Sequence, residues 1–309
     1  MTYFYWQVIV SILLLGLLRY RMLKEIGVYN VISDFSSRYV KEIRKFAIGI
    51  SVISIFCFVY NDINNILLAK WLSSAHFGLY SILLTIVSAY GMVSVSIKNS
   101  VFPHISSIVF KGDKSDISKS YLQYSAMFSF LFIPISVCAS INSHFLFGYW
   151  IQDKLILEGI QPSFPWIILG SMFNCMMMIP WSYLFARGQT KFLLVITGVL
   201  AVVSLPLLYF LVQVYGLLGA SMYWFFINFI PFIVMRLYVD FQILQEVISS
   251  WLYAIVLPLV LSIFIYTGFY FLNLTFHFQL SFALIICLLL TGMLYGILFR
   301  YSYTQIFSK

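Results

Sequence analysis

Charged residues are scarce in this sequence. Asp, Glu, Lys and Arg make up 9% of the 309 residues, whereas 62% are hydrophobic and the mean hydropathy is +0.98. A soluble domain has about a quarter charged residues and about half apolar ones. So little charge cannot cover a surface that faces water, but a surface that faces lipid needs none. The composition therefore excludes an ordinary soluble protein and predicts an integral membrane protein.

Motifs of enzymes and metal sites are missing as well. The sequence has no CxxC pair, no HxxxH or HExxH, and none of the patterns GxGxxG, GxxxxGK[ST] or GxSxG. Its four cysteines lie far apart inside apolar runs, which favours small buried residues over disulfides or a zinc site. We therefore expect no catalytic residue, no metal, no cofactor and no enzymatic activity.

Apolar runs long enough to cross a bilayer recur along the whole chain. About twenty helical residues span the hydrocarbon core. Connections between the runs are short, so an all-α membrane fold of about nine transmembrane helices is predicted. The nine runs are 3–18, 46–69, 77–103, 121–141, 164–186, 192–213, 217–235, 251–272 and 279–299.

The basic residues alternate from loop to loop. Sixteen of the eighteen fall in one set of loops, and Lys70 and Lys154 fall in the other. Because Lys and Arg gather in cytoplasmic loops, we expect an outside N-terminus and a cytoplasmic C-terminus. Short basic clusters between apolar runs do not form the continuous basic face of a nucleic-acid-binding protein, despite a net charge of +8. The expected partner is membrane lipid, and no nucleic acid.

The first cytoplasmic loop has a helical pattern of its own. In SDFSSRYVKEIRKF, Asp34 can cap a helix, and Phe35, Tyr39, Ile43 and Phe46 follow at helical spacing. One interpretation is a basic helix lying in the cytoplasmic interface, where anionic lipid attracts it. The other is an ordinary basic loop that obeys the orientation rule.

Polar residues gather inside one predicted span. Asn61, Asp62, Asn64 and Asn65 lie past the midpoint of the run 46–69 and fall within an arc of about 160° on a helix. An ionisable group in hydrocarbon usually faces a polar interior or a partner. We predict that Asn61, Asp62 and Asn65 line a transport cavity in which Asp62 can exchange a proton. The alternative is a hydrogen-bonded contact between helices.

Four other residues are weaker candidates for the cavity. Lys70 lies at the outer end of the polar span, where it either snorkels or pairs with Asp62 two turns away. Lys98 and Arg187 lie at the cytoplasmic ends of their spans and can attract an anionic headgroup. Asn228 is the fourth candidate, although a lone intramembrane asparagine, like Asn174, more often bonds a neighbouring helix.

Three segments resemble polysaccharide transporters of the multidrug/oligosaccharidyl-lipid/polysaccharide exporter superfamily. They are AKWLSSAHFGLYSILLTIVS, SVFPHISSIVFKGDKSDISKSY and ARGQTKFLLVITGVLAVVSLPLLYFLVQVYGLLGAS. The resemblance rests on the following residues of these segments: Gly78, Tyr80, Ser81, Pro103, Ser106, Gly112, Asp113, Gly188, Lys191, Gly216, Gly219 and Ala220.

The resemblance is strongest to O-antigen flippases of the Wzx type, over about residues 46–240. It implies a MATE-like fold that moves undecaprenyl-diphosphate-linked O-antigen or polysaccharide repeat units across the bacterial inner membrane by alternating access. It also implies three parts: a last N-lobe helix with its basic linker (1–45), a C-terminal lobe of six helices (46–240), and two additional helices (241–309). Such transporters have twelve to fourteen helices, so most of an N-terminal lobe is missing, and that lobe or a partner chain is expected.

Other functions stay open. An O-antigen polymerase, which is a membrane glycosyltransferase, usually has a sizeable outer loop with arginines, whereas the outer loops here carry Lys70 and Lys154. A drug or cation exporter would favour a more acidic cavity. The last alternative is a non-functional fragment.

Overall fold

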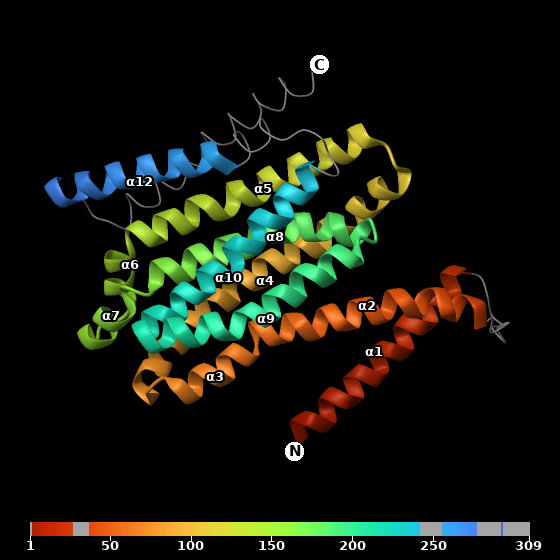
Figure 1. Cartoon of the computed structure of the whole chain (residues 1–309), viewed down its shortest axis with the longest axis horizontal. Helices are drawn as coiled ribbons and strands as arrows, with labels where there is room; N and C mark the ends of the chain where they lie inside the picture. Colours follow the sequence, from red (N-terminus) through yellow and green to blue (C-terminus); the bar gives the residue numbers. More distant parts are fainter. Residues whose placement is uncertain (1, 27–36, 242–254, 277–291, 293–309) are drawn as a thin grey trace. The chain divides into compact units, whose positions relative to one another are not determined.

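A computed structural model describes residues 2–26, 37–241, 255–276 and 292. These residues form helices and turns, with no strand among them (Figure 1). The chain divides into two compact units, Met1–Ala47 and Ile48–Lys309. The first unit contains α1 (Thr2–Ile26) and the beginning of α2 (Ser37–Asn61).

The second unit contains the rest of α2 and a bundle of further helices. They are α3 (Ile63–Trp71), α4 (Ser74–Lys111), α5 (Lys114–Ile141), α6 (Ser143–Trp150), α7 (Lys154–Ile160), α8 (Phe164–Ala186), α9 (Thr190–Tyr215), α10 (Leu217–Val239) and α12 (Leu257–Phe276).

Seven apolar stretches among the described residues are long enough to cross a membrane. They are α1, α2 from Ala47 together with α3, α4, α5, α8, α9 and α10, and they match the first seven predicted runs. The apolar helix α12 overlaps the eighth run, and the ninth run, 279–299, lies almost wholly outside the described residues. The prediction of an all-α, multi-pass membrane protein is confirmed.

Two local details differ from the predictions. The segment 34–46 had two interpretations, a separate interfacial helix and a basic loop. In the structure α2 begins at Ser37 and continues without interruption into the apolar run, so the described part of this segment is neither; the proposed cap, Asp34, lies outside the described residues. The outer loop 142–163 contains two short helices, α6 and α7, that were not predicted. Asp153 starts α7 by accepting a hydrogen bond from the Leu155 N–H at 2.9 Å.

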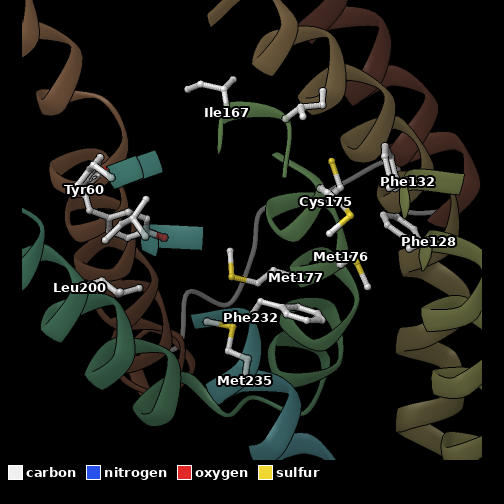
Figure 2. Packing of buried hydrophobic residues seen from close by; sticks show 14 of the residues in the cluster. Tyr60, Phe128, Phe132, Ile167, Cys175, Met176, Met177, Leu200, Phe232 and Met235 are labelled. Atoms are coloured by element: carbon white, nitrogen blue, oxygen red, sulfur yellow. Dashed lines mark hydrogen bonds between the residues drawn. The ribbon is translucent and has the colours of Figure 1, made fainter. Parts of the chain in front are cut away.

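Helix α8 is the centre of the second unit. It packs against α4, α5 and α10, and 72% of its most apolar stretch is buried inside the protein. Figure 2 shows its Cys175, Met176 and Met177 among aromatic and methionine side chains of α5 and α10. Gly170 permits this packing, because an added Cβ would lie 2.9 Å from the Phe225 Cα of α10. Helix α12 packs on α5, and α9 packs on α10.

Candidate functional site

The polar span is broken at the position of its acidic residue. Helix α2 ends at Asn61 and α3 begins at Ile63, and Asp62 between them has φ −101° and ψ −39°. The Asn65 N–H donates to the Asp62 carbonyl, three residues back, at 3.1 Å. A break of this kind inside a membrane frees backbone groups that must find new partners.

Asn64 and Tyr223 satisfy the backbone at this break. The Tyr60 carbonyl accepts hydrogen bonds from the Asn64 amide and from the Tyr223 hydroxyl, the latter at 3.0 Å. The same hydroxyl accepts a bond from Asn64 Nδ2 at 2.6 Å. Asn64 is 3% exposed and Tyr223 is 1% exposed. This network therefore holds the α2–α3 break against α10.

The four polar residues of the break do not share one environment. Asn64 faces the bundle with Ile53, Tyr60 and Leu68, whereas Asp62 is exposed on the opposite face of the helix. Asn61 and Asn65 are half-buried between these two faces. The sequence grouped all four on one side, and the structure turns Asn64 inwards and Asp62 outwards.

Changing Tyr223 to Phe should lower the free energy of unfolding by about 1–2 kcal/mol, because Tyr60 loses a donor and Asn64 loses an acceptor in a buried place. Thermal unfolding of the purified chain in detergent measures this effect. Tyr209→Phe is the matched control, since Tyr209 is 54% exposed. Equal unfolding temperatures of the Tyr223→Phe and Tyr209→Phe variants would contradict a stabilising role for the network.

Helix α4 presents a polar face to the outside of the second unit. Ser81, Thr85, Ser88, Ser96 and Asn99 are exposed and recur at helical spacing along this 38-residue helix. The four hydroxyls among them each donate to the carbonyl four residues earlier, at 2.7–3.1 Å. Their hydrogen-bonding needs are thus met within the helix, while the face stays polar.

Basic residues gather at one end of the second unit. Lys111, Lys114 and Lys119 flank the α4–α5 turn, and Arg187 and Lys191 flank the α8–α9 turn at the same end (Figure 1). Lys70 and Lys154 lie at the opposite end, near the start of α4. Asp62 and Lys70 are both exposed, and the described part of the chain has no ion pair between them. The Asp62–Lys70 pair, which was one of the alternatives for these residues, is therefore not formed.

An open cavity of about 1000 Å³ lies at the basic end. The last turns of α4 and the α8–α9 turn form its walls, and Arg187 is among the lining residues. Lys98 is not among them; it is half-buried on the face of α4 that carries the buried Ser94 and Ile105. Of the seven candidate residues, Asn61, Asp62 and Asn65 lie together at the break, and Arg187 lies at this separate cavity.

Asn228 lies inside the helix packing. It is 1% exposed, accepts a hydrogen bond from the Asn174 amide of α8 at 2.7 Å, and donates to the Trp224 carbonyl at 2.8 Å. This is the interhelical bond that lone intramembrane asparagines usually make. We therefore leave Asn228 out of the functional proposal below.

A buried charged cluster lies where the sequence pattern had placed Arg236 in a cytoplasmic loop. Arg236 is 1% exposed, and its Nε lies 2.9 Å from Oδ2 of Asp240, which is fully buried. The guanidinium also lies 4.7 Å from the ring centroid of Tyr121, which packs edge-on against Tyr183. The spacing of Arg and Asp four residues apart was the signal available in the sequence.

Comparison with known proteins finds relatives for about the first half of the chain. Residues 1–152 match the family described as "Polysaccharide biosynthesis protein". These residues, 49% of the chain, are similar to this polysaccharide biosynthesis family. A curated relative, the "Putative O-antigen transporter" of Shigella flexneri, is 30% identical over 146 residues, which is 47% of this chain and 34% of the relative. The match thus spans about a third of the relative's length, and no solved structure matches the chain.

The match to this family and the similarity to the O-antigen transporter confirm the resemblance found in the sequence, but over a different range. The family match contains the α2–α3 break and all of α4. It begins earlier than the predicted range 46–240 and ends at residue 152. Arg187 and the α8–α9 turn therefore lie outside the matched residues.

Proposed function

We propose that this chain takes part in transporting a polyprenyl-diphosphate-linked sugar repeat unit across the bacterial inner membrane by alternating access. The observation that carries the proposal is the family match over residues 1–152, which contains both the broken polar span and α4. The proposed substrate has an anionic diphosphate, a polar sugar and an apolar tail, so its carrier needs a polar path beside lipid.

The outer face of α2–α3 and α4 is the proposed wall of that path. Among the candidate spans of the second unit that the structure describes, these two are the least buried, with 22% and 17% of their most apolar stretches buried. Asp62 and the hydroxyl face of α4 occupy their exposed sides. A sugar finds the Asp62 carboxylate, the Asn99 amide and the acceptor lone pairs of the α4 hydroxyls on these sides.

The basic end of the second unit is the proposed loading side. Lys and Arg favour the cytoplasmic side of a membrane protein, so this end faces the cytoplasm and the N-terminus lies outside. Arg187 and Lys191 then attract the anionic headgroup from the inner leaflet, where the repeat unit is presented. Lys98, which precedes this end on α4, is the proposed next basic contact along the path. The opposite end, with Lys70 and Lys154, has little positive charge to hold the diphosphate before release.

Asp62 is the proposed coupling residue. It is exposed at a break between two helices, where a change of protonation can alter the angle between α2 and α3 without dismantling the buried Asn64–Tyr223 network. Asn61 and Asn65 flank it and offer donors and acceptors to a sugar. Because the match covers a third of the relative, a second lobe or a partner chain is the proposed opposite wall of the path.

Single cysteines should reveal the proposed orientation. Cysteines introduced at Ser74 and Gln161 should react with a membrane-impermeant maleimide in intact cells, because both positions lie at the end assigned to the outside. Cysteines at Ser115 and Gln189 should react only after the membrane is opened. Protection of the cysteines at Ser74 and Gln161 in intact cells, or labelling of those at Ser115 and Gln189, would refute the assigned orientation.

Transport can be followed in vesicles. The full chain, reconstituted with the part of the Shigella relative that it does not match, should accelerate movement of a fluorescent polyprenyl-diphosphate sugar between leaflets. Vesicles with Asp62→Asn should move it more slowly at equal protein content. Movement no faster than in protein-free vesicles would argue against transport.

A further inference from the structure

The cavity at the basic end has two walls that are fixed to each other. Helix α4 packs on α8, and Phe102 and Phe185 join the helices beside the cavity with ring centroids 6.2 Å apart. The lining is Pro103, Ser106, Ser107, Val109 and Phe110 of α4 with Ala186, Arg187 and Gln189 of the α8–α9 turn. A cavity of about 1000 Å³ is large enough for a charged group and a sugar together.

The α8–α9 turn holds Arg187 in a fixed backbone geometry. The Gln189 N–H donates to the Leu184 carbonyl at 2.9 Å, and the Gly188 N–H donates to the Phe185 carbonyl at 3.0 Å. This pair of bonds is the Schellman motif that ends many helices, and it needs the φ of +66° that Gly188 adopts. Arg187 precedes Gly188, is exposed, and its guanidinium has no ion pair in the described part of the chain.

Several donors in the cavity are uncommitted. Hydroxyls elsewhere on α4 bond their own helix, but those of Ser106 and Ser107 make no hydrogen bond within the described residues. The Gln189 side chain makes no capping bond to α9. The nearby Asp113 carboxylate is already engaged, since it accepts from the Ser115 N–H at 2.8 Å. An anion would therefore meet one guanidinium and several free donors.

Phe110 adds an aromatic surface at the same cavity. It is 93% exposed, more than any other large hydrophobic side chain in the described part of the chain. It lies beside Lys111, in the last turn of a helix about 57 Å long, well beyond what the hydrocarbon core needs. Its ring face carries partial negative charge, and the C–H groups of a pyranose ring carry partial positive charge.

We propose that this cavity binds the diphosphate–sugar headgroup of a polyprenyl-linked substrate before translocation. Arg187 with Ser106 and Ser107 holds the diphosphate, and Phe110 stacks on the first sugar. This assignment rests on the proposed function and adds to it a loading site with its own sugar-recognising residue. The apolar tail is left in lipid in this proposal.

Binding to the purified full chain tests the site without requiring transport. Two labelled probes are compared in nanodiscs: polyprenyl diphosphate, and the same lipid carrying one N-acetylhexosamine. Arg187→Ala should weaken the binding of both probes about fivefold. Phe110→Ala should weaken the sugar-bearing probe about fivefold and leave the bare diphosphate unchanged. Phe110→Trp should bind both probes as the wild type does.

Matched variants distinguish binding in this cavity from general effects of exposed aromatic or basic side chains. Phe264→Ala and Lys154→Ala change an exposed Phe and an exposed Lys away from the cavity. They should leave the binding of both probes unchanged. Phe110→Leu keeps an apolar group for lipid contact but removes the aromatic face, so it should behave like Phe110→Ala. The proposed stacking of Phe110 on the sugar would be refuted if Phe110→Leu bound both probes as the wild type does. It would also be refuted if Phe110→Ala weakened the binding of both probes equally. Binding that persists without transport would refute the proposed function and leave the site intact.

Discussion

Replacing Arg236 by methionine should lower the free energy of unfolding by about 3–5 kcal/mol. The change removes the guanidinium that lies 2.9 Å from the fully buried Asp240 carboxylate, and a buried charge without its partner is costly. The cation–π contact with Tyr121 is lost at the same time. The apolar volume of the side chain is largely kept, so the cost is mainly electrostatic.

The matched measurement uses thermal unfolding in detergent and the yield of monodisperse protein. Arg187→Met is the control, because Arg187 is an exposed arginine at the same end of the unit and its loss should leave stability unchanged. The double change Arg236→Met with Asp240→Leu should recover most of the lost stability, since both charges are then gone. Identical behaviour of Arg236→Met and Arg187→Met would show that the buried pair is unimportant.

Transport should fall about 25-fold when Lys98→Ala is combined with Arg187→Ala. A basic residue near an anionic surface contributes about 1 kcal/mol, or about fivefold, and the two effects should multiply if the sites are independent. Either single change should weaken transport without abolishing it. In cells, surface polysaccharide should decrease while lipid-linked repeat units accumulate on the cytoplasmic side.

Two comparisons make this prediction specific. Lys154→Ala removes an exposed charge at the opposite end and should leave surface polysaccharide unchanged. Asp62→Asn should slow transport but leave headgroup binding intact, because Asp62 is assigned to coupling. If Lys154→Ala matched the double variant, general surface charge rather than the loading end would be responsible.

Hydropathy located the helices well because burial in lipid acts on every residue of a span. The predicted run 164–186 coincides with α8, Phe164–Ala186. The positions of α9 and α10 were predicted within a few residues at each end. Hydropathy could not show that α2 already begins at Ser37, since a helix can continue past the membrane into polar sequence.

The environments of individual polar residues could not be predicted in the same way. Asn64 is buried because Tyr223, 159 residues away, bonds it, and Asp62 is exposed because the helix breaks at that position. Arg236 was predicted to lie in a loop; its spacing from Asp240 was visible in the sequence, but its burial against Tyr121, 115 residues away, was not. The rotation of a helix about its axis depends on neighbours that are distant in sequence, and periodicity alone does not identify them.

Complementation of bacteria that lack their O-antigen flippase tests the transport proposal most directly. The full chain is expressed alone, and together with the part of the Shigella relative that it does not match. We predict that the combined expression restores surface polysaccharide in flippase-null cells and that Asp62→Asn reduces the restoration. No restoration in flippase-null cells, or restoration in polymerase-null cells instead, would contradict the transport proposal, and the latter would favour an enzyme.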